Sequence, residues 1–207
     1  MMNKARHIAL VILAVLWVLP SAVHAASYSF AIGGFGNKVA FTNVSDESAV
    51  QVSHSIADYL FDELQDCPAM ELYDAVPMSS QARADEISVQ LDLGNMPPEY
   101  KSVEVEYVIG GYLSNMGLTI SNFKFAGVGG FSYKVDVDIS IKVYEKSTGR
   151  CVYTAVGNGE ANSEDFALSP LGIHLIRFGD IEFSAECYDA ALQNAVHQAA
   201  QKLKDNV

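Results

Sequence analysis

Basic residues are scarce in this sequence. Its 207 residues include 13 Lys and Arg against 25 Asp and Glu, which gives a formal net charge of −12 at pH 7. Nucleic-acid binding through phosphates needs clustered Lys and Arg, and docking on anionic lipid headgroups needs them as well. The composition therefore predicts no nucleic-acid partner, and it disfavours attraction to an anionic membrane surface.

Charged residues of both signs are also few. They make up 18% of the chain and apolar residues make up 50%, whereas a typical soluble domain is about 25% charged. Disordered chains have the opposite composition. A domain of about 150 residues hides roughly 68–70% of its unfolded surface, so a chain of this length is long enough for one well-packed domain.

Cysteine is rare, and its spacing is uninformative. Cys67, Cys151 and Cys187 are separated by 83 and 35 residues, which matches no zinc or redox motif. An odd number leaves at least one thiol free or bonded to another chain, so the pairing stays open. The simplest interpretation is that these are small buried side chains.

Recognisable catalytic motifs are missing as well. The sequence has no H-E-x-x-H, no G-x-S-x-G and no Walker A loop, and His54, His174 and His197 form no ligand pattern. Asp136 and Asp138 could share a strand face and contact a cation, although a solvated face is the simpler interpretation. The Gly-rich residues 127–130 suit a hairpin turn better than a phosphate site. We predict no catalytic residue, cofactor or metal site, and hence a protein that is not an enzyme.

The first 25 residues have the features of a secretory signal peptide. Lys4 and Arg6 precede an apolar run at residues 8–19, which is shorter than the roughly 20 residues of a spanning helix. Val23 and Ala25 occupy the −3 and −1 positions of a cleavage site. The sequence predicts export to the periplasm or cell envelope and cleavage after Ala25, with an uncleaved anchor as the alternative. No Cys follows the site, which predicts a chain that is not lipidated.

Strand and helix patterns alternate after the leader. Residues 26–37 form a lead-in segment or a short strand, and the main domain is assigned to residues 38–207. Apolar residues at i, i+4, i+7 and i+8 predict the helices. The predicted elements are strands at 38–44 and 70–75, helices at about 49–66 and 79–91, and a connector at 94–99.

The most regular segment is residues 131–143, in which apolar and polar side chains alternate without a break. This pattern predicts a long strand with one buried and one solvated face. Extended stretches at 103–125 and 150–160 flank it, and a helix is predicted at 184–203. The order predicts the α+β class: a mixed sheet with a long antiparallel β-meander and helices packed on one face.

One apolar segment fits neither a helix nor a long strand. Residues 166–178 (FALSPLGIHLIRF) include Pro170 and Gly172 and belong to a long connection, of a kind that is often functional. Either the segment packs on the core, or it is an exposed patch for a protein partner or a membrane. The candidate interaction residues are Phe166, Leu168, Leu171, Ile173, Leu175, Ile176 and Phe178.

Several motifs, taken in order, resemble the curli production assembly/transport component (CsgG) family. They are residues 39–44, the helix with IADYL at 56–60, ELYD at 71–74, EYVIGGY at 106–112 and VYEKSTGR at 143–150. The resemblance covers most of residues 38–205. It implies an anticodon-binding-like α+β domain of the periplasm, in a family that contains oligomeric outer-membrane secretion channels.

Two functions follow from these patterns. The first is a non-enzymatic envelope protein that binds envelope proteins or itself, as an assembly or secretion accessory and a soluble, non-lipidated relative of the CsgG family. The alternative is a subunit of an oligomeric outer-membrane channel. The channel, which requires contact with the outer membrane, is the less favoured of the two functions, because this sequence has no lipidation Cys after the leader.

Overall fold

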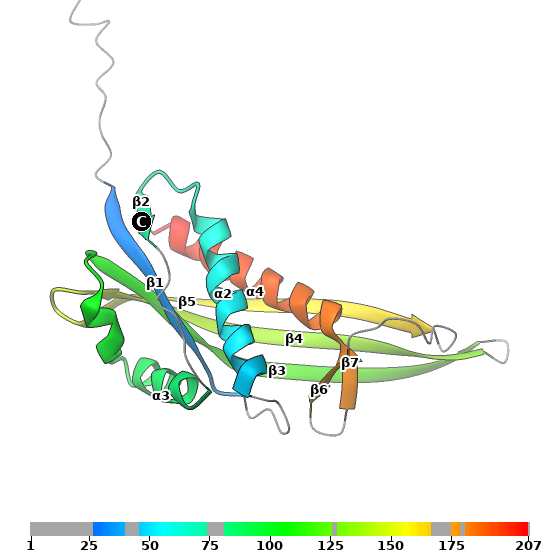
Figure 1. The fold of residues 1–207 in the computed structure, drawn as a ribbon. Coiled ribbons are helices and arrows are strands. Elements are labelled where there is room, and N and C mark those ends of the chain that lie inside the picture. Colours follow the sequence, from blue (N-terminus) through cyan, green and yellow to red (C-terminus); the bar gives the residue numbers. More distant parts are fainter. Residues whose placement is uncertain are drawn as a thin grey trace, which may run out of the picture.

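The computed structural model describes residues 27–39, 46–73, 81–125, 128–166, 175–178 and 181–206. Strands and helices follow one another along the chain in an order typical of an α+β domain (Figure 1). The elements are β1 (Tyr28–Asn37), α2 (Asp46–Leu64), β2 (Met70–Tyr73), α3 (Gln81–Asp92), a 3₁₀ helix (Pro98–Ser102), β3 (Tyr107–Phe125), β4 (Val128–Glu145), β5 (Arg150–Phe166), β6 (Leu175–Phe178), β7 (Ile181–Ser184) and α4 (Ala185–Lys204).

Five strands form one mixed sheet in the order β2-β1-β3-β4-β5. β1 runs parallel to both β2 and β3, whereas β3, β4 and β5 are antiparallel neighbours. The predicted α+β class and the long β-meander are therefore confirmed. The register of β3 against β4 shifts between Leu113 and Asn115.

The segment left open as a lead-in or a short strand is the ten-residue strand β1. It lies inside the sheet, between β2 and β3, and its residues from Phe30 to Asn37 are buried. Of the strand predicted at 38–44, Lys38 and Val39 lie outside any strand, just after β1 ends at Asn37, and residues 40–44 lie outside the described residues. A Gly-rich, aromatic sequence hid this strand, since glycine is depleted in strands.

The larger core lies between the sheet and the two long helices, on what we name the main face. Every odd position of β4 from Val135 to Val143 is buried there, as the alternation predicts. The apolar stripes of α2 and α4 pack against these positions, and both stripes match those read from the sequence. Their buried members are Ile56, Leu60, Leu64, Leu192, Ala195, Val196, Ala199 and Leu203.

A smaller core lies on the opposite face, which we name the second face. Ile87 and Leu91 of α3 pack there with Tyr100 of the 3₁₀ helix and Tyr144 of β4. The helices thus divide between the two sides: α2 and α4 share the main face, and α3 covers part of the second. The even positions of β4 are accordingly solvated only in part, because Tyr144 is fully buried.

Tyr100 fixes the contact between this second core and the sheet. Its side chain lies directly over Gly33 of β1 and Gly110 of β3. A Cβ at Gly33 would come within 2.5 Å of the ring, and a Cβ at Gly110 within 2.3 Å of the hydroxyl oxygen. Its hydroxyl donates a 2.6 Å hydrogen bond to the carbonyl of Gly34. The two glycines are required here because they leave the space that the ring fills.

Candidate functional site

The predicted interaction patch is only partly within the described residues. Phe166 ends β5, and Leu168, Leu171 and Ile173 lie outside the described residues. Leu175, Ile176 and Phe178 lie in β6, which pairs with β7 as an antiparallel two-stranded sheet. The sequence analysis missed this hairpin, although Gly179-Asp180 between apolar residues is a hairpin signal. Whether the patch binds a partner stays a prediction.

A different apolar surface is visible in the sheet itself. β3, β4 and β5 continue beyond the helices, as Figure 1 shows, and their pairing extends to Phe125 opposite Val128 and Gly130 opposite Phe166. We name this part the sheet extension. On its main face, Leu118 and Ala161 flank Val135, and Ile120 lies opposite Tyr133. Ile120 is 39% exposed, and Leu118, Tyr133 and Ala161 are half-buried.

The second face of the extension is polar. Lys134 forms ion pairs with Glu160 at 2.8 Å and with Asp136 at 3.1 Å, and these hydrogen bonds, led by Glu160, raise the pKa of Lys134. Further along, Asp138 accepts hydrogen bonds from Asn158 and Asn115 on its two neighbouring strands. Around Val135 the extension therefore has one apolar and one polar face, and the predicted solvated face at Asp136 and Asp138 is formed by ion pairs and amides.

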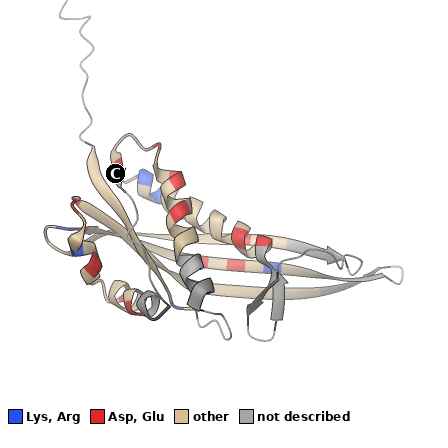
Figure 2. Cartoon of the chain, in the orientation of Figure 1, with Lys and Arg blue, Asp and Glu red and all other residues tan. Residues whose placement is uncertain are grey.

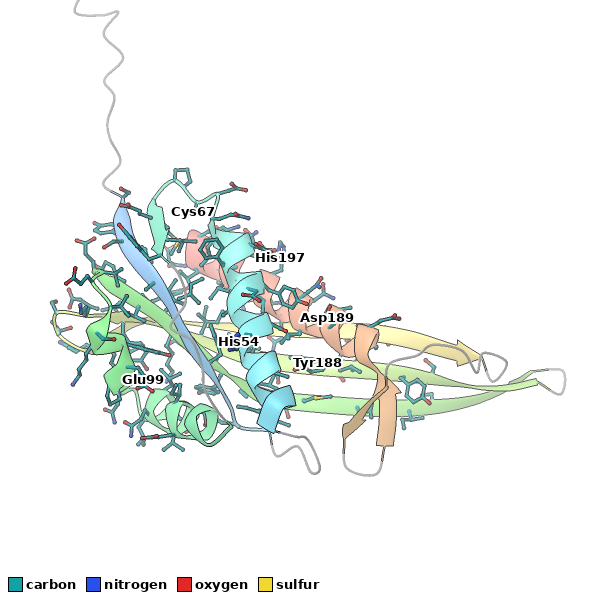
Figure 3. The ribbon with its side chains drawn as sticks, viewed as in Figure 1. His54, Cys67, Glu99, Tyr188, Asp189 and His197 are labelled. Carbon is teal, nitrogen blue, oxygen red and sulfur yellow. The ribbon has the colours of Figure 1, made fainter. Side chains whose placement is uncertain are left out.

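The histidines and cysteines do not gather into a site. His54 is exposed on α2, His174 lies outside the described residues, and His197 on α4 bonds Glu63 of α2 at 2.7 Å. Figure 3 shows His54 on α2, His197 on α4 and Cys67 beyond the end of α2, well apart from one another. Among the described residues, no group of three or more His, Cys, Asp or Glu could hold a metal ion. Cys67 and Cys151 are free thiols.

The contacts of Glu63 tie α2 to α4. Burial alone would raise the pKa of this carboxyl, but its hydrogen bond to His197 and the nearby charge of Lys204 lower it overall. Lys204 lies 3.5 Å away. A second bond of the same kind joins the Tyr59 hydroxyl to Asp189, and burial and that bond raise the pKa of Tyr59. Polar contacts at two levels thus hold the helix pair together.

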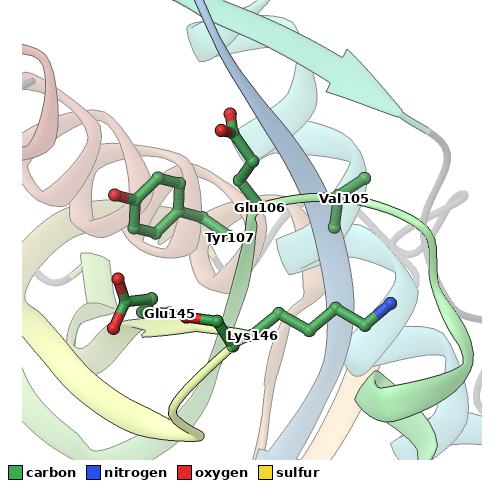
Figure 4. A pocket seen from close by; sticks show the side chains of 6 residues that line it. Val105, Glu106, Tyr107, Glu145 and Lys146 are labelled. Atoms are coloured by element: carbon green, nitrogen blue, oxygen red, sulfur yellow. The ribbon is translucent and has the colours of Figure 1, made fainter.

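A hollow of about 410 Å³ lies where β3 begins and β4 ends (Figure 4). Its polar groups are used to join strands. The Glu106 carboxylate accepts from the backbone N–H of Ser29, and the Ser29 hydroxyl accepts from the N–H of Glu106. Lys146 donates to the carbonyl of Val103. Tyr107 stacks on Phe30, with ring centroids 5.1 Å apart. The residues around the hollow therefore hold the strands together at this end of the sheet.

Charge is not concentrated at any of these places. Figure 2 shows acidic residues on helices and strands alike. No helix in the described part of the chain is both long and apolar enough to cross a membrane. The apolar strip of Leu118, Ile120, Tyr133 and Ala161, which we name the extension strip, is therefore the surface that best suits a candidate binding site.

No family model matches the chain, and no curated protein matches it. Several solved structures are similar to it. The PelC dodecamer from Paraburkholderia phytofirmans is 12% identical with a TM-score of 0.44, and the match covers 87% of this chain and 89% of that chain. The hypothetical protein CT253 from Chlamydia trachomatis is 9% identical with a TM-score of 0.47, covering 87% and 95%.

The LpoB C-terminal domain from Salmonella enterica is a third such structure. It is 12% identical with a TM-score of 0.32, and the match covers 70% of this chain and 90% of that chain. Because these TM-scores are below 0.5, the likenesses carry no argument about function. The resemblance to the CsgG family is not confirmed by any of these comparisons and stays a prediction.

Proposed function

We propose that this chain is an exported, non-enzymatic protein of the cell envelope, and that it binds a protein partner through the sheet extension. The observation that carries the proposal is the extension strip, an apolar row that continues past the two helices which cover the rest of the main face. The leader at residues 1–25 supports export. An accessory role in assembly or secretion, as in the CsgG family, is the finer form of this proposal.

The shape of the strip favours protein over lipid. Leu118 and Ile120 occupy alternate positions of β3, and the next alternate positions hold Asn122 and Lys124. A strand that faces lipid needs an apolar band about 9–11 residues long. The short band and the ion-paired second face instead suit a narrow contact with another protein, of the kind that combines an apolar centre with a polar rim.

Site-specific photocrosslinking tests the proposal in the native host. A photoreactive residue at Ile120 lies on the main face, and the same residue at Thr119 lies on the other face one position earlier, which gives a matched control. We expect a discrete crosslinked envelope protein from position 120 alone. Recovery should fall at least about tenfold when Leu118→Asp is added, since a buried charge opposes binding. Equal crosslinking from both positions, or none from position 120, would contradict the proposal.

The long β3–β4 hairpin is the observation that favours the alternative, a subunit of an outer-membrane channel. The two strands have 19 and 18 residues and remain paired up to the turn. Fractionation of the mature protein separates the two functions. Recovery in the soluble envelope fraction without detergent would contradict the channel, and recovery only with detergent as a large oligomer would contradict the accessory.

A further inference from the structure

β5 is an edge strand of the five-stranded sheet. It pairs with β4 on one side, and no strand of the described chain pairs with its other side. Such an edge presents a row of backbone N–H and C=O groups that can pair with another chain. β5 has 17 residues, well above the usual strand length of about 5–6, so its outer edge is long.

Three side chains of α4 occupy this edge. The backbone N–H of Asn158 donates to Oε1 of Gln198 at 2.9 Å, and the side-chain amide of Asn194 donates to the backbone carbonyl of Glu160 at 3.0 Å. Lys202 donates to the carbonyl of Val156 at 2.7 Å. Side chains therefore stand where a neighbouring strand would place its backbone.

The two spacings match. Residues 194, 198 and 202 are four apart on a helix, which is about 6 Å, and residues 160, 158 and 156 are two apart on a strand, which is about 6.6 Å. Gly157 and Gly159 let the helix come close enough, since a Cβ at these positions would lie 1.9 and 1.8 Å from the carbonyls of Ala195 and Ala191. The helix thus runs along the edge, and each of its successive turns supplies one side chain that bonds a backbone group of β5.

The protected segment has the composition of a self-pairing strand. Residues 152–158 read VYTAVGN and contain no charged side chain. Val152 is 53% exposed and Val156 is 44% exposed. Short uncharged segments rich in Val, Tyr and Thr are the ones that pair with copies of themselves, and natural proteins guard them with Lys and other polar groups.

We propose that the outer edge of β5 is a self-recognition edge, and that Asn194, Gln198 and Lys202 keep it closed in the monomer fold. Its occupant, when open, is the same edge of a second copy. Antiparallel pairing about Ala155 would set Val152 opposite Asn158 and Thr154 opposite Val156, and would bring Arg150 near Glu160 of the second copy. With a net charge of −12, two copies repel each other over most of their surfaces, and this uncharged stretch is an exception.

The test compares two variants of equal charge. Asn194→Ala/Gln198→Ala removes two of the guards, and Gln193→Ala/Gln201→Ala changes two other exposed amides of the same helix. Alanine is a strong helix former, so both helices should keep their circular dichroism. Light scattering after size exclusion, over a range of protein concentrations, gives the mass of each.

We expect the guard variant to reach twice the mass of the wild-type species as concentration rises, while the control keeps the wild-type mass. Adding Lys202→Ala should lower the concentration at which this happens. Adding Val156→Lys should restore the wild-type mass, because the two introduced lysines would be diagonal neighbours of like charge on one face of the paired strands. If both variants keep the wild-type mass, if both associate equally, or if Val156→Lys does not reverse association, the proposal is wrong.

Discussion

Two buried tyrosines on the second face differ in what their hydroxyls do. Tyr100 donates to the carbonyl of Gly34, whereas the Tyr144 hydroxyl is buried without a hydrogen-bond partner among the described residues. Burial raises the pKa of both, so each is neutral in the folded protein. The hydroxyl group therefore stabilises the fold at Tyr100 and destabilises it at Tyr144.

We expect Tyr100→Phe to lower the free energy of unfolding by about 1–3 kcal/mol, because it leaves a buried carbonyl unpaired. Tyr144→Phe should leave that free energy unchanged within about 0.5 kcal/mol or raise it, because it removes an unpaired hydroxyl. Urea unfolding of the two variants beside wild type measures both. A larger loss from Tyr144→Phe than from Tyr100→Phe would contradict this account of the second core.

The carboxyl of Glu63 predicts how stability depends on pH. Burial opposes ionisation, but His197 and Lys204 prevail and hold its pKa below the ordinary 4.5. A carboxyl with a lowered folded pKa contributes stability above its unfolded pKa and loses that contribution as the pH falls through the folded value. The contribution of Glu63 should therefore be present at neutral pH and decline below about pH 4.5.

Glu63→Gln should lower the free energy of unfolding at pH 7 by about 0.5 kcal/mol, the size of a partly exposed ion pair. The difference from wild type should shrink between about pH 5 and about pH 3. Urea unfolding across that range is the measurement, with Glu186→Gln, an exposed carboxyl in the first turn of α4, as the control. A difference that grows as the pH falls would contradict the assignment.

β5 and α4 approach each other closely. Gly159 lies so near α4 that a Cβ would meet the carbonyl of Ala191, whereas a Cβ at Gly117 of β3 would come no closer than 3.5 Å to its neighbours. Small residues on both elements, Ala191 and Ala195 on the helix and the glycines on the strand, make this approach possible.

Gly159→Ala should lower the free energy of unfolding by at least about 1–3 kcal/mol, the usual effect of overpacking, because helix and strand must separate. Gly117→Ala should change it by less than about 0.5 kcal/mol or raise it, since glycine weakens a strand interior. Thermal unfolding followed by circular dichroism compares them. Equal effects would show that the helix is not held as closely as the structure indicates.

The elements differ in how readily their sequences predict them. The alternation of residues 131–143 predicts both the strand and its buried face, because successive side chains of a strand point to opposite faces and only one face is apolar here. The stripes of α2 and α4 are predictable for the same reason with a period of 3.6. For β1 the sequence leaves a lead-in segment and a short strand as alternatives, and it does not predict the β6–β7 hairpin, because the glycine, aromatic and apolar residues of these segments have no period that separates strand from connector.

The candidate site was harder to predict than the fold. The length of β3 and β4 is visible in the sequence, but the point at which the helices stop covering them is not, because it depends on how α2 and α4 lie on the sheet. Ile120 and Ile139 are the same residue type in alternating strands, yet the first is 39% exposed and the second is fully buried. Only tertiary structure distinguishes them.

At the scale of the whole molecule, the two edge strands of the five-stranded sheet differ in length and in how they are protected. β2 is a four-residue edge strand, too short to attract a partner strand, and β5 is long and guarded by α4. Both are recognised ways of limiting edge-to-edge association. An acidic protein that carries an apolar strip needs such limits if its contacts are to stay specific.

The position of β1 also has a consequence for how the chain acquires its structure. β1 is the first of the described strands, yet its neighbours are β2 and β3, which follow it by about 40 and 75–80 residues in register. The meander of β3, β4 and β5 needs only hairpin contacts between sequence neighbours. Since contacts of long sequence separation slow folding, β1 can pair only once residues far along the chain are available, whereas the meander can form from sequence neighbours.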